Sequence, residues 1–317
     1  MKAAAHAGVV RHAAALVFGC ALAALGARSA QASVTVTDDG GQRVTLAAPA
    51  ERIVALAPHA VELVYAAGGG AKLVGAVSYS DYPSAAKTLP RVGTNTTLDL
   101  ERIAALRPDL VIVWRHGNSQ RQLDRLRELG IALYRSEPHK IDDVATDLIA
   151  LGTLMGTASQ AQAAAADYRG KIAALRARYE RRSPVSVFYE AWADPLMTLN
   201  GAQIISDVIA LCGGRNVFAN LAPLVPTVST EAVVAADPEA IVTASAGATK
   251  PDAVLPSLAA WRAWPRMTAV ARGNLFAIDG DLITRPAPRL AQGAEALCRD
   301  LDLARARRPG ADASGAH

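Results

Sequence analysis

The chain has 317 residues, of which 51% are hydrophobic and 20% are charged. This length is enough for two domains of ordinary size, and no biased tract dominates the middle, so the composition predicts a packed globular protein. Three of the 33 basic residues, Lys2, Arg11 and Arg28, lie in the first 32 positions, which leaves 30 basic against 29 acidic residues beyond them. Because this balance is near neutral, the net charge gives no reason to expect binding to nucleic acid or to a membrane surface.

Residues 1–32 predict a secretory signal peptide. A basic start precedes an apolar run over residues 13–25, and Ala30-Gln31-Ala32 forms an A-x-A cleavage site. The alternative of an N-terminal membrane anchor is weaker, because the apolar run is short for a span. A lipoprotein modified at Cys20 is also weaker, because the bulky Phe18 lies just before it. We therefore expect export to the periplasm and cleavage.

Alternating strands and helices predict an N-terminal α/β lobe over residues 33–155. A β-hairpin around the turn at residues 38–41 comes first, and Asp99 is suited to cap a later helix. The strands are near-continuous apolar runs, which is typical of a mostly parallel sheet. The predicted strands are residues 52–58, 73–78, 109–114 and 131–136, and the predicted helices are residues 61–67, 99–107, 119–129 and 141–155.

A long helix is predicted to connect this lobe to a second one. Residues 158–182 contain no proline and are rich in Ala, Arg and Gln. A helix of this length spans on the order of 35 Å at 1.5 Å per residue. The simpler alternative is a surface helix of a single domain. Because the α/β pattern restarts after it, we interpret residues 156–182 as a stiff connector.

The restarted pattern predicts a C-terminal α/β lobe over residues 183–305. Strands are expected at residues 185–192 and 274–279, and helices at residues 204–211 and 288–303. The remaining residues, 306–317, are expected to form a disordered tail.

One helix–strand unit is written twice. Leu100–Ile112 reads LERIAALRPDLVI and Thr230–Val242 reads TEAVVAADPEAIV, so Glu101 matches Glu231 at an offset of 130 residues. One such unit in each lobe indicates a pseudo-two-fold arrangement. In open α/β sheets ligands bind beyond the carboxyl ends of the strands, so two facing lobes predict a ligand cleft between them. Each glutamate lies on the first turn of its helix, where the helix dipole favours a carboxylate, and this effect alone can explain both residues. The alternative interpretation is that the two glutamates form a matched pair that binds a symmetric partner.

Cys212 and Cys298 are the cysteines that remain after removal of the leader. In an oxidising compartment they suggest one disulfide, and two buried free thiols are the alternative.

Motifs of the common enzyme classes are absent from the sequence. No G-x-S-x-G occurs, and Gly68–Lys72 lacks the spacing and the ending of a phosphate-binding loop. A protein that carries a metal ion would use a histidine-rich cleft, but the histidines between the leader and the C-terminus are His59, His116 and His139. We therefore predict neither catalysis nor a resident metal. His59 and His116 both follow strands and can approach the cobalt of a corrin or the iron of a haem.

Several stretches together resemble the periplasmic cobalamin-binding proteins of ABC importers, within the siderophore, haem and cobalamin family. The resemblance covers most of the chain beyond the leader. The helix–strand unit is shared by the whole family, whereas SYSDYP and VWRHGN point to cobalamin. The stretches are SYSDYP (78–83), LDLERIAALRPDLVIVWRHGN (98–118), RQLDRLRELGI (121–131), LCGGRNVF (211–218) and RPAPRL (285–290).

The resemblance implies two Rossmann-like lobes with mostly parallel sheets, one long connecting helix and a ligand cleft between the lobes. It implies that Tyr79 and Trp114 pack on the corrin plane, which suits aromatic faces. It also implies that Asp281 and Arg285 reach the amide-rich edge of the ligand as acceptor and donor. Without the resemblance, the sequence is equally compatible with Trp114 in the hydrophobic core and with Asp281 and Arg285 as a simple ion pair on the surface.

The same resemblance implies the partners. Glu101 and Glu231 match two glutamates that dock on arginines of a permease homodimer, which works with ATPase subunits at the inner membrane. Cys212 and Cys298 match a disulfide pair. The protein is expected to be a monomer that carries cobalamin as its transported ligand, without a catalytic cofactor.

The sequence departs from the closest pattern at aromatic positions. Asn95 replaces one aromatic residue, another is missing near Val225, and Ala191 and Met197 replace two phenylalanines. The neighbouring Trp192 is expected to compensate as a ligand contact. The less aromatic pocket keeps haem or an iron siderophore as the alternative ligand, with Tyr79 as an iron ligand.

Overall fold

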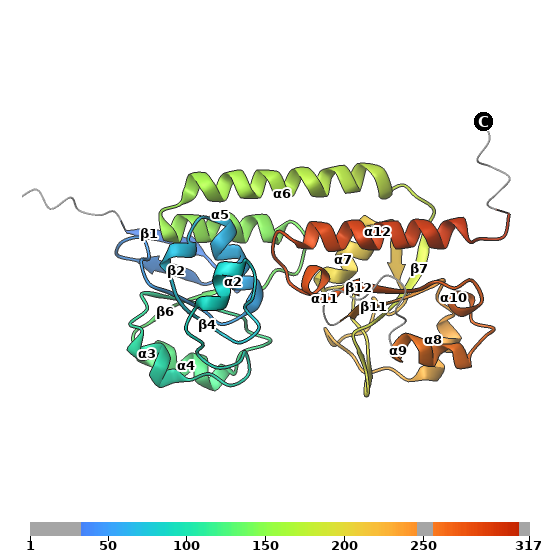
Figure 1. Ribbon diagram of the computed structural model, residues 1–317, viewed down its shortest axis with the longest axis horizontal. Coiled ribbons are helices and arrows are strands. Elements are labelled where there is room, and N and C mark those ends of the chain that lie inside the picture. Colours follow the sequence, from blue (N-terminus) through green and yellow to red (C-terminus); the bar gives the residue numbers. More distant parts are fainter. Residues whose placement is uncertain (1–32, 246–255, 311–317) are drawn as a thin grey trace, which may run out of the picture.

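The computed structural model describes residues 33–245 and 256–310, which form two lobes side by side beneath a long helix (Figure 1). The predicted signal peptide, with its cleavage site and Cys20, lies outside the described residues. Among the helices of the described ranges, none combines the length and apolar character that crossing a membrane requires.

The N-terminal lobe has the predicted parallel sheet, whose strand order is β4-β3-β5-β6, and the predicted antiparallel hairpin, β1–β2. All four residues of the central β5 are buried, which explains its uninterrupted apolar sequence. The strands are β1 Val34–Thr37, β2 Arg43–Leu46, β3 Ile53–Ala55, β4 Leu73–Ala76, β5 Leu110–Val113 and β6 Ala132–Arg135.

Helices cover both faces of this sheet, because alternate side chains of each strand point to opposite sides. Ile53 and Ile112 face one core together with α2 and α5, whereas Val54 and Val111 face a second core under α3 and α4. The helices are α2 Pro58–Ala66, α3 Leu100–Ala105, α4 Gln120–Glu128 and α5 Asp143–Met155, with short 3₁₀ turns at η2 Gly70–Lys72 and η3 Ser84–Thr88.

The C-terminal lobe repeats this plan with the parallel order β10-β7-β11-β12. Helices α7 and α12 pack on one face, and α8 to α10 lie toward the other (Figure 1). The strands are β7 Val185–Glu190, β10 Gly214–Asn216, β11 Ala240–Ser245 and β12 Leu275–Asp279. The helices are α7 Ile204–Leu211, α8 Thr230–Ala236, α9 Pro256–Ala260, η4 Trp261–Ala263, α10 Thr268–Ala271, α11 Gly280–Ile283 and α12 Leu290–Ala306.

A disulfide joins α7 to α12. Cys212, which ends α7, is bonded to Cys298 in α12, with their Cα atoms 4.7 Å apart, and both residues are fully buried. The disulfide prediction is therefore confirmed.

The long helix α6, Ala158–Tyr179, lies across the top of both lobes (Figure 1). It is shorter at both ends than the predicted connector. Its buried positions recur at helical spacing, and the hydroxyl of Tyr168 donates to the Ile141 carbonyl at 3.1 Å. The buried side chains of α6 belong to one hydrophobic core that also includes α5, α7 and α12, so apolar packing as well as chain connection joins the lobes.

The C-terminal lobe contains elements that the sequence did not predict. The strand expected over residues 185–192 ends at Glu190, because the backbone N–H of Ala191 donates to the Met197 carbonyl and starts a small hairpin. Its two strands are β8 Trp192–Ala193 and β9 Leu196–Met197.

The end of α12 also differs from the prediction of a disordered tail from residue 306. The helix extends to Ala306, and Arg308 then donates to both carboxylate oxygens of Glu239, at 2.9 and 2.8 Å. Arg307 and Arg308 are therefore held against the C-terminal lobe, and residues 311–317 lie outside the described ranges.

Candidate ligand-binding cleft

A cavity of about 600 Å³ lies between the two lobes. Its walls come from segments that follow the carboxyl ends of strands β3, β4, β5, β6 and β12, which is the expected place for a ligand in such sheets. A larger hollow of about 910 Å³ lies along α4 and is lined by none of the predicted site residues. The N-terminal lobe contributes Pro58, His59, Tyr79, Asn95, Trp114, His116, Glu137, Pro138 and His139; the C-terminal lobe contributes Gln203, Ile204, Leu224, Val225, Asp281, Thr284, Arg285 and Pro286.

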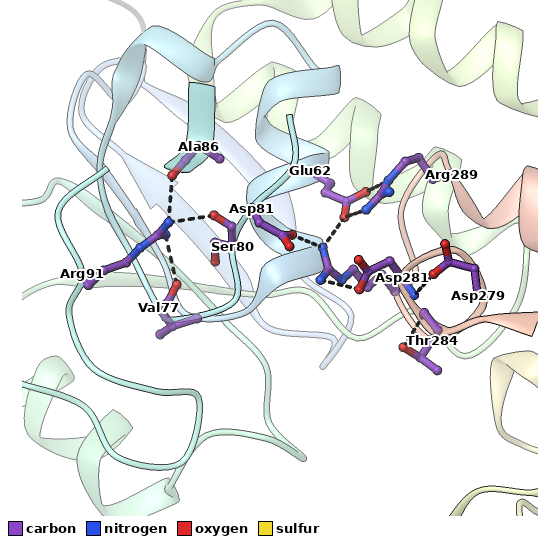
Figure 2. Close-up of polar contacts among 12 residues, drawn as sticks. Glu62, Val77, Ser80, Asp81, Ala86, Arg91, Asp279, Asp281, Thr284 and Arg289 are labelled. Atoms are coloured by element: carbon purple, nitrogen blue, oxygen red, sulfur yellow. Dashed lines mark hydrogen bonds and ion pairs between the residues drawn. The ribbon is translucent and has the colours of Figure 1, made fainter. Parts of the chain in front are cut away.

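Tyr79 stands in the cavity wall with 77% of its surface exposed. Its φ of 64° is in the left-handed region, which tyrosine rarely adopts, so the surrounding loop must hold it there. Arg91 does so by donating to the carbonyls of Val77, Ser80 and Ala86 at 3.0 to 3.2 Å (Figure 2). An aromatic ring held in this way presents its surface to a ligand at little entropic cost.

Trp114 lies at the end of β5 and is fixed on several sides. Its indole covers Gly117 so closely that a Cβ at that glycine would lie 1.9 Å from the ring. The side chain of Asn118 accepts from the Trp114 backbone N–H at 2.7 Å and donates to the carbonyls of Leu56 and Asn95. Trp114 therefore packs partly against the core and partly into the cavity, which combines the two interpretations of the sequence.

His59 follows β3 and packs edge-to-face against Trp114, with the ring centroids 5.9 Å apart. Burial lowers the pKa of His59 to about 4, and the positive charge of Arg285 adds to this effect. Its Nε2 is 3.4 Å from the Ser136 carbonyl oxygen, so the ring is a neutral, largely enclosed part of the wall.

His116 has a different environment, because half of its side chain is exposed. Its Nδ1 is hydrogen-bonded to Glu137, and the ring lies edge-on to His139 with centroids 6.3 Å apart. Glu137 is almost completely buried at the end of β6. The sequence indicated His116 as a residue near the cleft but gave no sign of Glu137.

A cluster of charged side chains bridges the lobes at one edge of the cavity (Figure 2). Arg285 donates to Glu62 at 3.1 Å and to Asp81 at 2.8 Å, both in the N-terminal lobe, and pairs with Asp281 of its own lobe at 2.6 Å. Arg289 binds both oxygens of Glu62 at 2.8 and 2.6 Å. We refer to these five residues as the interlobe cluster.

The interlobe cluster still leaves Arg285 with unused donors. A guanidinium has five N–H groups, and the contacts to Glu62, Asp81 and Asp281 use three of them. The structure therefore brings the predicted pair Asp281 and Arg285 to the cavity wall, but Arg285 also has a role between the lobes that the sequence did not reveal.

Trp192 is the predicted ligand contact that the structure does not bring to the cavity wall. It lies on β8 with 64% of its surface exposed, and its indole N–H donates to the Asp194 carbonyl at 2.8 Å. Asn95, which replaces an aromatic residue of the pattern, and Val225, near which another is missing, do line the cavity.

Glu101 and Glu231 lie away from the cavity, on α3 and α8, at the lower end of each lobe (Figure 1). Both side chains are exposed. Each is the second residue of its helix, two positions after an N-cap: Asp99 accepts from the Arg102 N–H at 2.9 Å, and Ser229 from the Ala232 N–H at 3.2 Å. Hydrogen bonds from its own backbone N–H and from Ser229 hold the pKa of Glu231 below its usual value.

Comparison with known proteins gives a consistent result. The family model described as "Periplasmic binding protein" matches residues 53–282. The vitamin B12-binding protein of Vibrio cholerae is 38% identical over 257 residues, which cover 81% of this chain and 91% of that protein. The vitamin B12-binding protein of Yersinia pestis is 38% identical over 252 residues, which cover 80% and 86%.

Solved structures agree with these relatives. The periplasmic vitamin B12 binding protein of Vibrio cholerae superimposes with a TM-score of 0.74 over 81% of this chain and 98% of that chain, at 38% identity. A periplasmic haem-binding protein from a Roseiflexus species gives a TM-score of 0.69 at 25% identity, covering 80% of this chain and 99% of that chain.

Proposed function

This chain belongs to the periplasmic binding protein family, and on that basis we propose that it captures cobalamin between its lobes and delivers it to an ABC transporter. The family is one of binding proteins rather than enzymes. The observation that carries the proposal is the composition of the cavity: exposed aromatic surface of Tyr79 and Trp114 on one wall, and Asp281 with Arg285 on the other. The apolar corrin plane of cobalamin matches the aromatic wall, and its amide-rich rim matches the wall with Asp281 and Arg285.

Titration calorimetry with cyanocobalamin tests the proposal. We expect one molecule bound per protein. Trp114→Ala and Tyr79→Ala should each weaken binding by about 1–3 kcal/mol, because each removes aromatic surface that the bound ligand would cover. Trp264→Ala provides the matched control, because Trp264 is partly exposed on the C-terminal lobe and does not line the cavity. The absence of heat or spectral change with any cobalamin would contradict the proposal.

Trp192 enters the proposal only as a contact for a part of the ligand that extends beyond the cavity. Its exposed indole on the β8–β9 hairpin provides apolar surface there. Trp192→Ala is therefore expected to weaken binding less than Trp114→Ala in the same titration.

Haem is the second candidate ligand, because His116 and Tyr79, two residue types that bind haem iron, both face the cavity. The similarity to a haem-binding protein supports keeping this alternative. Absorbance spectra of the protein mixed with haemin or with cyanocobalamin distinguish the two, and an iron siderophore requires its own titration.

Delivery requires a partner, and we propose that the exposed Glu101 and Glu231 dock on arginines of a permease homodimer, which works with ATPase subunits at the inner membrane. Their equivalent positions in the two lobes support this assignment. Exposed charge pairs of this kind set docking orientation and association rate more than they affect ligand binding. In this proposal the protein acts as a monomer in the periplasm, after removal of residues 1–32.

A further inference from the structure

We propose that His116 is an axial ligand to the cobalt of the bound corrinoid, with Glu137 as the residue that orients its ring. This inference rests on the proposed function and specifies the chemistry of the same cleft. The inference predicts which corrinoid the protein prefers, because only a corrinoid with an exchangeable axial ligand can accept a nitrogen atom from the protein.

The first argument is the position of the ring. His116 lies three residues beyond the end of β5, lines the cavity and keeps half of its side chain exposed. Of the other two histidines in the cavity wall, His59 is only 4% exposed and has its Nε2 directed at the Ser136 carbonyl. Within the described ranges, no carboxylate is hydrogen-bonded to the ring of His139. His116 is therefore the best-placed imidazole for a metal in the cavity.

The second argument is the hydrogen bond behind the ring. A carboxylate can only accept, so Nδ1 of His116 carries the proton that it donates to Glu137, and in the neutral imidazole the lone pair is then on Nε2. Within the described part of the chain, Nε2 has no hydrogen-bond partner. The Glu137 side chain is 7% exposed and also accepts from the His116 backbone N–H at 3.3 Å, which fixes it against the ring. A carboxylate behind a histidine is the usual arrangement around metal-binding imidazoles, where it sets the ring orientation and raises its basicity.

The third argument is that the residues suit one axial bond rather than a resident metal ion. Among the described residues, no group of three or more His, Cys, Asp or Glu side chains is arranged to hold a metal. A corrin already supplies four nitrogens to its cobalt, so a single imidazole is sufficient.

The step is a ligand exchange. The Nε2 lone pair of His116 forms a Co–N bond to Co(III), the Co–O bond to the axial water breaks, and the water leaves. No electron is transferred, and the proton on Nδ1 stays in its hydrogen bond with Glu137. Cyanocobalamin, whose cyanide exchanges poorly, should be held by the cavity walls without this bond. The wild-type protein should therefore prefer aquocobalamin.

The test compares visible absorption spectra of aquocobalamin and cyanocobalamin bound to the mature protein, without residues 1–32. Aquocobalamin in free imidazole provides the reference spectrum. We expect bound aquocobalamin to show the imidazole-ligated spectrum. His116→Ala should lose this spectrum and lower the affinity ratio of aquocobalamin to cyanocobalamin by more than about tenfold, and Glu137→Gln should lower it by about tenfold. His139→Ala should keep the imidazole-type spectrum, and free imidazole added to His116→Ala should restore it.

Two results would overturn the axial bond and leave the proposed function in place. One is wild-type protein that binds cyanocobalamin but leaves the spectrum of aquocobalamin unchanged; the proposed function then stands and the axial bond does not. The other is an imidazole-type spectrum that survives in His116→Ala and disappears in His139→Ala. If neither cobalamin binds, the proposed function fails, and the axial bond fails with it.

Discussion

Replacing Glu62 with glutamine should weaken the contact between the lobes more than any exposed charge substitution. The Glu62 side chain is 2% exposed and receives both Arg285 and Arg289. Without the charge of Glu62, Arg285 keeps Asp81 and Asp281. Among the described residues Arg289 then has no ion-pair partner in contact and keeps the Tyr82 ring, whose centroid is 3.9 Å from its guanidinium carbon, and the more distant charge of Asp281.

The expected size follows from this difference. Breaking a buried ion pair on one side costs about 3–5 kcal/mol, because a charge is left without its partner. Since Arg285 retains two carboxylates, we expect Glu62→Gln to lower the free energy of unfolding by about 3 kcal/mol, near the lower end of that range. Stabilities of ordinary domains are about 5–15 kcal/mol, so the change is large.

Urea unfolding of wild-type and variant protein measures this change. The matched control is Glu128→Gln, which removes the exposed pair with Arg125 and should cost about 0–1 kcal/mol. The double variant Glu62→Met with Arg289→Met should regain part of the loss, because apolar groups replace an ion pair whose desolvation was costly. A Glu62→Gln protein as stable as Glu128→Gln would refute the reasoning, since it would mean that the interlobe cluster is solvated.

Three further predictions concern other parts of the molecule. The folded protein keeps His59 neutral with its pKa lowered to about 4, so the free energy of unfolding falls as the pH drops below the ordinary histidine pKa. Between pH 7 and 5 this group should account for a loss of about 2 kcal/mol. Urea unfolding at the two pH values measures the loss, which His59→Asn should lack. Replacing Cys212 and Cys298 with serine opens a bridge between positions 86 residues apart and should lower stability by about 4–5 kcal/mol in the chain-entropy model, measured by thermal unfolding. Mature wild-type protein, without Cys20, should label close to no free thiol without reductant, and two labelled thiols would contradict the pairing. Glu101→Arg with Glu231→Arg should abolish cobalamin uptake and permease association, whereas ligand affinity in solution should stay within about threefold of wild type; normal uptake or lost ligand binding would contradict docking at these positions.

Much of the fold was predictable because it depends on local patterns. Apolar runs such as residues 110–113 indicated buried parallel strands, and Asp99 was predicted as the helix cap that it forms. Parallel strands end at one edge of their sheet, so His59 and His116, which follow strands, were expected near a cleft. Trp114 was assigned to the ligand only by the resemblance.

The interlobe cluster was not predictable in this way. Glu62 lies in α2, where its neighbours are apolar and buried, and nothing in that local pattern identifies its partners. Arg285 and Arg289 follow 223 and 227 residues later, and only the packing of the two lobes brings the three together. The β8–β9 hairpin was missed for another reason: strands of two residues are too short to show an alternating pattern.

The repeat explains how one fold presents two different kinds of surface. The offset of 130 residues relates the caps Asp99 and Ser229, the two exposed glutamates and the left-handed residues Arg107 and Asp237, and the strand orders of the two sheets correspond. The cavity walls do not follow this symmetry, since aromatic and imidazole rings come mainly from the N-terminal lobe and the Asp281–Arg285 pair from the other. A two-fold partner requires equivalence only on the outer surface, whereas a ligand with an apolar plane and a polar rim is best matched by unlike walls. In the proposed function, the duplication would allow docking to a symmetric permease while the residues of the cavity wall are free to differ. The histidine beside Glu137 is one such difference.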